Sequence, residues 1–452
     1  MSELIISVSG LRGIVGETLT ARVAVDYAAA FSAESPPGSV LIGRDGRAGG
    51  AMFAQAIAAA LRGLGRHVLD GRVMATPTVG LLVRRLGAAG AIQISASHNP
   101  IEYNGFKLFG SEGRVLPADI GARVARRYRD ADPVAWVASR DIGGFESVED
   151  TITAHRDAVL ATVDVERIRA RRFRVLLDAN HGAGSLLGTA LLESLGCALS
   201  TLGGTPDGQF AHAPEPTAEH VAPVGREVVA RGADVGFCQD PDADRLAVLD
   251  ETGRYVGEES TLAMCLRHRL SQSAGPIVVN CATSRMAQDL ANQFGVPLIR
   301  SRVGEAHVAD AMIGSGAVFG GEGNGGPIDP RVGYVRDSFV GMALILDALA
   351  QHGRPLSAWA DELPRYAIEK TKATLPPDRL AAVLDRLEST FSDARSDRQD
   401  GLRLDWSDRW LLIRGSNTEP IVRVIAEART AVEANRMCGE ARETISQVAA
   451  NR

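Results

Sequence analysis

A polar cluster that could carry a nucleophile ends the apolar run Ala-Ala-Gly-Ala-Ile-Gln-Ile. The run leads into Ser95, then Ser97 and His98, and Asn99-Pro100 closes the stretch. A serine fixed by a turn at the end of a strand is a suitable position for an exposed nucleophile. Lys107 follows ten residues after Ser97 and could carry charge or a proton beside it. A Ser-His pair alone is more often a plain polar turn, so other motifs must support this interpretation.

Three alternating carboxylates form a candidate metal site. The stretch QDPDADR at 239–245 contains Asp240, Asp242 and Asp244, followed by Arg245. Alternate residues of an extended loop point the same way, so the three carboxylates would repel one another without a cation. Oxygen ligands suit Mg²⁺ better than Zn²⁺, and three of them leave positions for water or a phosphate oxygen. A solvated acidic turn is an equally good interpretation of this loop alone.

Two further loops could recognise a ligand. GGEGNGG at 320–326 has five glycines that allow close backbone approach, and Glu322 and Asn324 could bind hydroxyls. It lacks the lysine and hydroxyl residue of a phosphate-cradling Walker loop. RGSNTEPIVR at 414–423 gathers donors suited to a phosphate. These donors are Arg414, Ser416, Asn417, Thr418 and Arg423. Each loop alone could be an ordinary turn.

Composition narrows the class of protein. With 452 residues the chain should form two to four domains, and its net charge of −6 argues against a nucleic-acid partner. The five cysteines form no CxxC pair, which favours reduced thiols and a cytoplasmic protein. No apolar run approaches the roughly 20 residues needed to cross a bilayer, so we expect no membrane association. Only three residues are lysines, Lys107, Lys370 and Lys372, against a large excess of arginine.

The elements that must position these loops alternate between strand and helix. VLIGRD (40–45) reads as a strand, GAMFAQAIAAALRGLG (50–65) as a helix, and AAGAIQIS and GFKLF as later strands. Thr76-Pro77 is expected to be the N-cap and first turn of the next helix. VLIGRDGR, RVLLDANHGAG (174–184) and PIVVNCATSR (276–285) share one plan of strand, polar loop and helix. They indicate three related α/β domains, or three ordinary strand-to-loop transitions.

The last part of the chain has a different pattern. It reads β-α-β-β-β-α, which predicts a small antiparallel sheet backed by two helices. We therefore predict an α/β protein with three similar mixed-sheet α/β domains and a smaller C-terminal α+β domain around a central cleft. The expected domains are 1–150 with the serine loop, 151–250 with the aspartate loop, 251–365 with the glycine loop and 366–452 with the arginine loop.

Together the four loops resemble those of the α-D-phosphohexomutase family, which includes phosphoglucosamine mutase and phosphomannomutase/phosphoglucomutase. SASHNP is similar to its phosphoserine loop, DPDADR to its metal loop, GEGNGG to its sugar-recognition loop and RGSNTEP to its phosphate-binding loop. The four occur in the family's order over nearly the whole chain. The glycine loop differs from the GEMSGH of phosphomannomutase/phosphoglucomutase and from the GEQSGH of the usual bacterial phosphoglucosamine mutase.

The resemblance implies a role for each position. Ser97 would carry the phosphoryl group and, with Asp240, Asp242 and Asp244, hold one Mg²⁺ per chain. Arg12 in SGLRG, Arg245, His98 and Lys107 would serve catalysis. The proton carrier would be Lys107, with a pKa lowered by two nearby guanidinium groups, or else His98 or Glu305. The substrate would contact Glu322, Asn324, Glu305 and Arg302. The grip on the substrate's other phosphate would come from Arg414, Ser416, Asn417, Thr418 and Arg423.

The implied reaction interconverts hexose 6-phosphate and hexose 1-phosphate through a hexose 1,6-bisphosphate. The preferred expectation is a phosphoglucosamine mutase, a cytoplasmic monomer or homodimer. The alternatives are a phosphomannomutase/phosphoglucomutase of relaxed specificity, a metal-dependent serine phosphatase and a sugar-phosphate binding protein without activity.

Overall fold

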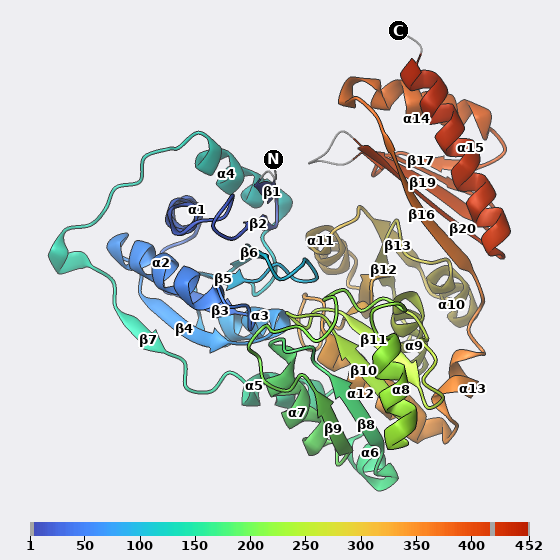
Figure 1. Cartoon of the computed structure of the whole chain (residues 1–452), viewed down its shortest axis with the longest axis horizontal. Helices are drawn as coiled ribbons and strands as arrows, with labels where there is room; N and C mark the ends of the chain where they lie inside the picture. Colours follow the sequence, from blue (N-terminus) through green and yellow to red (C-terminus); the bar gives the residue numbers. More distant parts are fainter. Residues whose placement is uncertain (1–3, 416–420, 451–452) are drawn as a thin grey trace.

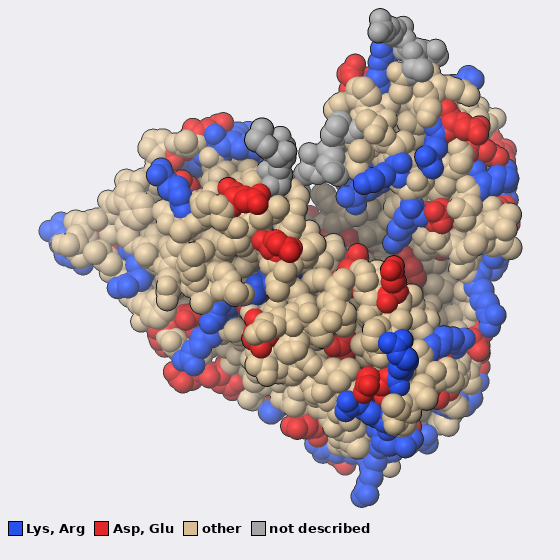
Figure 2. All heavy atoms as spheres, in the orientation of Figure 1, with Lys and Arg blue, Asp and Glu red and all other residues tan. Residues whose placement is uncertain are grey.

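The computed structural model describes residues 4–415 and 421–450. They form four α/β or α+β units that follow one another along the chain (Figure 1). The space-filling view in Figure 2 shows a hollow between the N-terminal unit and the C-terminal one, with basic side chains along the C-terminal wall and acidic ones on the floor. No helix among the described residues has the length and apolar character required of a membrane span.

Domain I contains a seven-stranded sheet of order β1-β2-β6-β5-β3-β4-β7. Its strands are β1 (Ile5–Ser7), β2 (Gly10–Ile14), β3 (Val40–Arg44), β4 (Val68–Val73), β5 (Gly90–Ile94), β6 (Tyr103–Gly110) and β7 (Phe145–Ser147). Its helices are α1 (Ala21–Glu34), α2 (Gly50–Gly63), α3 (Thr76–Leu86) and α4 (Ala118–Arg129), with the 3₁₀ turn η1 (Ser139–Asp141). The strand β5 is buried along its whole length, as expected for an apolar strand covered on both faces.

Domains II and III each contain a four-stranded mixed sheet. The strands are β8 (Arg174–Asp178), β9 (Ala198–Leu202), β10 (Val235–Gln239) and β11 (Leu246–Asp250), then β12 (Ile277–Asn280), β13 (Leu298–Ser301), β14 (Phe319–Glu322) and β15 (Gly326–Ile328). The helices are α5 (Thr153–Leu160), α6 (Val165–Arg171), α7 (Gly184–Ser194), α8 (Ala222–Arg231), α9 (Glu258–Gln272), α10 (Met286–Phe294), α11 (Glu305–Ser315), α12 (Ser338–His352) and α13 (Leu356–Ala360). One continuous apolar core joins these two domains.

The first three domains share one strand plan. In each, a central first strand lies parallel to the second and third strands, and a fourth strand pairs antiparallel with the third. The sets are β3, β4, β5 and β6 in domain I, β8, β9, β10 and β11 in domain II, and β12, β13, β14 and β15 in domain III. The three expected repeat units therefore correspond to the first strand of each set, and the prediction of three similar α/β domains is confirmed.

Domain IV is the predicted antiparallel sheet with two helices. Its elements are β16 (Ala367–Thr374), η2 (Pro377–Arg379), α14 (Leu380–Thr390), β17 (Arg395–Asp397), β18 (Leu402–Asp405), β19 (Trp410–Gly415), β20 (Ile421–Ala428) and α15 (Ala431–Ala450). The sheet order is β16-β20-β19-β18-β17. The sequence pattern did not predict β17, because this three-residue edge strand, Arg-Ser-Asp, carries no alternation of apolar and polar residues.

The predicted start of α3 was wrong by one residue. Ala75, rather than Thr76, is the N-cap, and Thr76 already belongs to the helix. Thr76 does not cap the helix with its hydroxyl group. Instead, the hydroxyl donates to Asp242 Oδ2 of domain II at 2.6 Å. A contact between domains has thus replaced the local cap that the Thr-Pro pair suggested.

Candidate active site

Three of the four polar loops occupy the same position in their domains. The serine loop joins β5 to β6, the aspartate loop joins β10 to β11, and the glycine loop joins β14 to β15. In every case the loop follows the third parallel strand and precedes the antiparallel fourth strand. Ligands of open α/β sheets bind beyond the carboxyl ends of parallel strands. The shared strand plan therefore delivers a serine, a carboxylate cluster and a glycine-rich turn from equivalent strand ends.

Ser97 lies against the aspartate loop. Its Oγ donates a hydrogen bond to Asp240 Oδ2 at 2.7 Å, and the residue is buried. Its φ of 47° is in the left-handed region, which is uncommon for a residue other than glycine. The Ser97 amide donates to Ser95 Oγ at 2.9 Å, and Ser95 Oγ donates to Asp45 Oδ2 at 2.7 Å. Several contacts therefore hold the candidate nucleophile in an unusual backbone conformation.

Arg47 holds the Ser97 loop in place through hydrogen bonds to its backbone. Its guanidinium donates to the carbonyl oxygens of Ser97 at 2.7 Å, Asn99 at 2.6 Å, Pro100 at 2.6 Å and Tyr103 at 3.0 Å. It also donates to the carboxylate of Asp45 at 3.2 Å and stacks on the ring of Phe210. Five donors in a planar fork match this set of acceptors, which a lysine ammonium with three donors could not satisfy. Arg47 is thus a positioning residue for Ser97.

Replacing Arg47 by lysine should destabilise the protein by roughly 2–4 kcal/mol, because at least two of its five buried or part-buried acceptors would lose their donors. Turnover should fall as the Ser97 loop loosens. Urea unfolding and a rate assay on the same preparation would measure both effects. The exposed pair of Arg22 with Asp26 provides the control, since Arg22→Lys should change neither. Unchanged stability of Arg47→Lys would contradict a positioning role.

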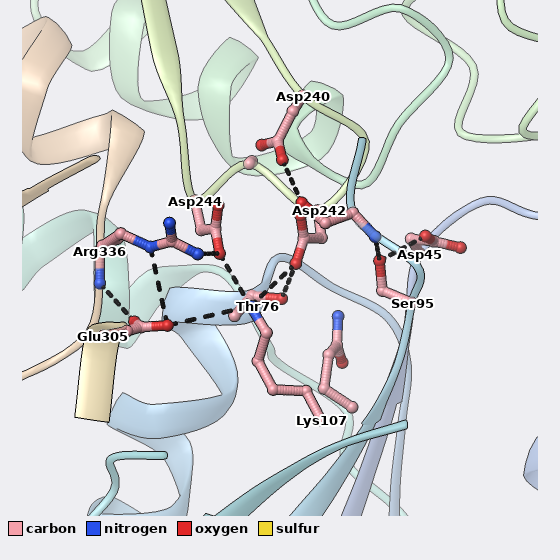
Figure 3. Close-up of polar contacts among 12 residues, drawn as sticks. Asp45, Thr76, Ser95, Lys107, Asp240, Asp242, Asp244, Glu305 and Arg336 are labelled. Atoms are coloured by element: carbon pink, nitrogen blue, oxygen red, sulfur yellow. Dashed lines mark hydrogen bonds and ion pairs between the residues drawn. The ribbon is translucent and has the colours of Figure 1, made fainter. Parts of the chain in front are cut away.

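The three aspartates converge on one point. Ligand oxygens of Asp240, Asp242 and Asp244 all lie within 4.8 Å of one another, and the side chains are fully buried (Figure 3). Oδ1 of Asp242 and Oδ1 of Asp244 are buried without a hydrogen-bond partner among the described residues. Buried carboxylate oxygens without partners are costly unless a cation joins them. The oxygen-only donor set fits a hard divalent ion such as Mg²⁺.

The charges around the aspartates are unevenly distributed. Arg336 donates to Asp244 Oδ2 at 2.6 Å, and Lys107 donates to the same atom at 2.8 Å. Burial alone would raise the pKa of Asp244, but these two cations and Arg245 hold it well below its usual value. Burial and the two neighbouring carboxylates raise the pKa of Asp240 well above its usual value. Asp240 is thus less well neutralised than Asp244, although Arg245 lies near both, and Asp240 is the carboxylate that faces the Ser97 hydroxyl.

The expectation for the pKa of Lys107 was wrong in direction. Burial alone would lower it. The carboxylates of Asp244, Asp242 and Glu305 outweigh burial and the nearby guanidinium of Arg336, so the pKa of Lys107 lies above its ordinary value. The Lys107 ammonium is 2.8 Å from Asp244 and 3.3 Å from Asp242. In this arrangement Lys107 holds its proton and contributes charge.

His98 and Arg12 lie beside the serine. His98 Nδ1 is 3.4 Å from Ser97 Oγ. Burial, reinforced by the guanidinium groups of Arg245 and Arg12, lowers the pKa of His98 to about 2. The imidazole is therefore neutral and a weak base in this environment. Arg12 Nη1 donates to Asn99 Oδ1 at 3.0 Å, which connects the N-terminal SGLRG stretch to the serine loop.

The remaining predicted cation and acids of the cleft have protein partners. Arg245 extends from the aspartate loop to Glu215 at 3.5 Å. Glu305 accepts from the Arg336 amide at 2.8 Å and lies 4.0 Å from Lys107. Glu322 accepts from the Asn280 side chain and the Gly304 amide through one oxygen and from Arg336 through the other. Arg302 is exposed.

The glycine loop packs against protein at two of its glycines. A Cβ on Gly323 would lie 2.0 Å from a carboxylate oxygen of Glu259, and one on Gly325, at φ 79°, would lie 2.2 Å from the Leu246 carbonyl oxygen. We expected these glycines to let a ligand approach the backbone closely. In the structure, Gly323 and Gly325 instead allow close packing against other parts of the protein. Asn324 Oδ1 is buried without a hydrogen-bond partner among the described residues. Its hydrogen-bonding capacity is therefore not used by the described part of the protein.

Glu259 beneath the glycine loop should make stability depend on pH. Burial raises its pKa from 4.5 to about 8, against an opposing hydrogen bond from the Ser284 amide. A carboxyl that stays protonated in the folded state while the unfolded chain ionises loses stability as pH rises. The free energy of unfolding should therefore fall between pH 4.5 and 8, by up to about 5 kcal/mol. Glu259→Gln should remove this fall.

Urea unfolding at several pH values would measure the slope for Glu259→Gln and the wild-type chain. The exposed Glu219 provides the matched control, because Glu219→Gln should keep the wild-type slope. Parallel slopes for the Glu259 variant and the wild-type chain would contradict the interpretation.

Domain IV supplies a row of cations. Arg423 on β20 is the cross-strand partner of Arg414 on β19 and of Lys372 on β16. A groove of about 490 Å³ is lined by Lys370, Lys372 and Arg423, together with apolar residues of β20. Arg414 lies 3.2 Å from Asp400. The three other residues of the predicted phosphate grip, Ser416, Asn417 and Thr418, lie outside the described residues.

Sequence reasoning missed Arg336, Thr76 and the Asp45–Arg47 pair. Arg336 joins Asp244, Glu305 and Glu322, so it connects the aspartate loop to the glycine loop. No local pattern separates it from the many other arginines. The position of Asp45 and Arg47 could have been inferred from the sequence. The two residues follow β3, the parallel neighbour of β5, and must therefore lie at the same sheet edge as Ser97.

Comparison with known proteins gives four matches in chain order. The models of phosphoglucomutase/phosphomannomutase alpha/beta/alpha domains I, II and III match residues 4–134, 153–253 and 258–366, and the C-terminal domain model matches 369–444. A "Phosphoglucomutase/phosphomannomutase" of Thermococcus kodakarensis is 36% identical, covering 93% of this chain and 94% of the relative. A "Probable phosphoglucosamine mutase" of Methanopyrus kandleri is 32% identical, covering 96% and 95%.

A solved structure agrees over the full length. The crystal structure of a phosphoglucomutase/phosphomannomutase family protein from Burkholderia thailandensis aligns with a TM-score of 0.82 and 27% identity, over 99% of both chains. A putative phosphomannomutase from Thermus thermophilus shares the fold, with a TM-score of 0.83 at 23% identity. The four domains, their order and the close approach of Ser97 to the three aspartates lead to one conclusion. This chain belongs to the phosphoglucomutase/phosphomannomutase family.

Proposed function

We propose that the chain is a phosphohexomutase that interconverts glucosamine 6-phosphate and glucosamine 1-phosphate. The observation that carries the proposal is the position of the Ser97 hydroxyl, whose Oγ lies 2.7 Å from Asp240 Oδ2. Asp240 belongs to a buried triad in which Oδ1 of Asp242 and Oδ1 of Asp244 have no hydrogen-bond partner among the described residues. A second candidate is a phosphoglucomutase/phosphomannomutase of relaxed specificity, favoured by the name of the relative at 36% identity. Relatives named phosphoglucosamine mutase, at 32% identity, favour the first.

Ser97 would carry the phosphoryl group in the active protein. A sugar hydroxyl oxygen attacks phosphorus, the bond from phosphorus to Ser97 Oγ breaks, and a hexose 1,6-bisphosphate results. The return step transfers the other phosphoryl group to the same Oγ. Mg²⁺ held by Asp240, Asp242 and Asp244 would offset negative charge on the phosphoryl group.

The surrounding side chains have separate tasks. The sugar hydroxyl proton must end on the released Ser97 Oγ, and His98 Nδ1 lies 3.4 Å from that atom. With a pKa of about 2 the imidazole is too weak a base to hold this proton and would only pass it on. Lys107 and Arg12 supply positive charge beside the transferred group. Asn324, with its free Oδ1, would accept from a sugar hydroxyl. Arg302, which is exposed, would reach the substrate only from the cleft edge.

The phosphate that does not react would bind to domain IV. Arg414 and Arg423 present guanidinium groups from adjacent strands, and Lys372 extends the row. Guanidinium groups bind phosphate in a bidentate manner, which suits a grip that must accept either phosphate in turn. We propose Ser416, Asn417 and Thr418 as further donors of this grip.

A comparison of turnover on glucosamine, mannose and glucose 6-phosphates, each with its matching 1,6-bisphosphate, tests the proposal. A preference for the amino sugar in kcat/KM supports the first candidate, and similar values for glucose and mannose support the second. Release of inorganic phosphate without isomerised product would instead indicate a phosphatase. Intact-mass measurement would show whether Ser97 carries phosphate, and an unmodified, inactive chain would indicate a binding protein.

A further inference from the structure

A second cavity lies between domains III and IV, apart from the loops described above. Its volume is about 810 Å³. Domain III contributes α10 and β13 to its wall, and domain IV contributes β17, the end of β18 and the turn at 406–409. That turn leads into the start of β19, whereas Arg414 lies near the end of β19. Six residues of strand separate the two ends by roughly 20 Å. The cavity is therefore not part of the candidate active site.

Arginines outnumber carboxylates in this cavity by four to three. Four line it, namely Arg285, Arg300, Arg395 and Arg409. Its carboxylates already have partners: Asp405 accepts two hydrogen bonds from Arg403, at 2.9 and 2.8 Å. Asp393 accepts from the Trp406 indole, and Asp408 accepts from Arg409. The acidic groups of the wall are thus occupied by neighbouring donors.

Three of the arginines make no ion pair closer than 4.0 Å with a carboxylate in the described part of the chain. Asp405, the cross-strand partner of Arg395, attracts Arg395 and Arg300, but its oxygens accept from Arg403. Among the described residues, the side chain of Arg300 donates to Gln288 alone, at 3.2 Å. Arg285 donates to the Trp406 carbonyl at 3.1 Å, and its carboxylate contact, with Asp289, is at 4.0 Å. The side chain of Arg395 makes no hydrogen bond or ion pair within the described part of the chain. Burial lowers the pKa of Arg300 to about 10, and the guanidinium groups nearby act in the same direction.

We propose that this cavity is a binding site for a small molecule that carries a diphosphate group, held by Arg300 and Arg285 of domain III and Arg395 of domain IV. Guanidinium groups bind phosphate oxygens in pairs, and an anion would relieve the repulsion among these three cations. The volume suits a ligand of nucleotide size. Most of the residues in the wall are polar or charged, with Leu298 and Trp406 as the apolar members, and this lining favours a polar, anionic ligand.

A ligand in this cavity would connect two domains. It would contact β13 on one wall and β17 on the other, and it would stabilise the arrangement of domains III and IV seen here. The groups proposed to hold the substrate's distal phosphate lie on the same domain IV sheet. If the proposed function holds, a bound diphosphate should restrain domain IV and lower kcat.

Calorimetric titration of the full-length chain with pyrophosphate, at low salt, tests the binding. We expect two classes of site in the wild-type chain. Arg300→Gln and Arg395→Gln should each weaken binding in the cavity between domains III and IV at least tenfold, and they should leave binding at the cation row of domain IV unchanged. Arg414→Gln should weaken binding at the cation row alone. Arg226→Gln, which removes an exposed arginine of domain II, should affect neither. ADP should compete for the class that Arg300→Gln weakens.

Two results would overturn the proposal. One is a wild-type chain whose only pyrophosphate site is the one lost in Arg414→Gln. The other is unchanged binding in both Arg300→Gln and Arg395→Gln. Turnover is a separate readout: at constant free Mg²⁺, pyrophosphate should lower kcat of the wild-type chain and have less effect on Arg395→Gln. Absence of any turnover would reject the proposed function, while the titration would still decide the binding site.

Discussion

Ser97→Ala should reduce turnover of hexose phosphates by roughly 10³-fold or more, and it should abolish phosphorylation of the chain. The hydroxyl is the group that approaches Asp240 at 2.7 Å, and its loop is held by backbone contacts that alanine keeps. The Ser97 amide would still donate to Ser95 Oγ, and Arg47 would still bind the Ser97 carbonyl oxygen. The variant should therefore fold, and intact-mass spectrometry together with a coupled turnover assay would measure both losses.

The control for this change is Ser389→Ala. Ser389 is an exposed serine of α14 whose hydroxyl donates, among the described residues, to the Asp385 carbonyl oxygen alone, so its loss should change neither mass shift nor turnover. Wild-type turnover by Ser97→Ala would reject the nucleophile. A phosphoryl mass that persists in Ser97→Ala would assign the modification to another residue.

The fold was largely predictable because each α/β domain repeats one local pattern. The first strand of each four-strand set is an apolar run that ends in polar residues, as in VLIGRD, RVLLD and PIVVN. This is the pattern of a strand buried on both faces. Once the first three domains are seen as equivalent, the serine, aspartate and glycine loops must lie at equivalent strand ends. The pattern did not predict β17. Its three polar residues join the sheet by backbone pairing with β18.

The site was predictable where residues cluster in sequence and not where single side chains meet from distant segments. The aspartates lie within five residues of one another, so their convergence follows from loop geometry. Arg336 reaches Asp244 across 92 positions, and Thr76 reaches Asp242 across 166. The direction of the Lys107 pKa depended on such contacts. The sequence suggested neighbouring arginines, whereas the folded chain places Lys107 against three carboxylates.

Asp242→Asn should have opposite effects on the chain with and without Mg²⁺. Without the ion, the variant should be more stable than the wild-type chain by on the order of 1 kcal/mol, because one of three mutually repelling buried carboxylates is removed. Oδ1 of Asp242 is buried without a hydrogen-bond partner among the described residues, and an amide at this position could donate to a neighbouring carboxylate. Mg²⁺ affinity should fall by about 10²-fold or more, and turnover should fall with it.

Thermal unfolding with and without Mg²⁺ separates the two effects. Mg²⁺ should raise the melting temperature of the wild-type chain, because an ion that binds only the folded state stabilises it by mass action. It should leave Asp242→Asn unchanged at the same concentration. Asp119→Asn, which alters an exposed carboxylate, should respond to Mg²⁺ as the wild-type chain does. If Mg²⁺ stabilised Asp242→Asn equally, the ion would bind elsewhere, and the unpartnered oxygens of the triad would need another explanation. If the variant were instead less stable without Mg²⁺, the hydrogen bond from Thr76 to Asp242 would outweigh the repulsion, and the triad would act first as a contact between domains.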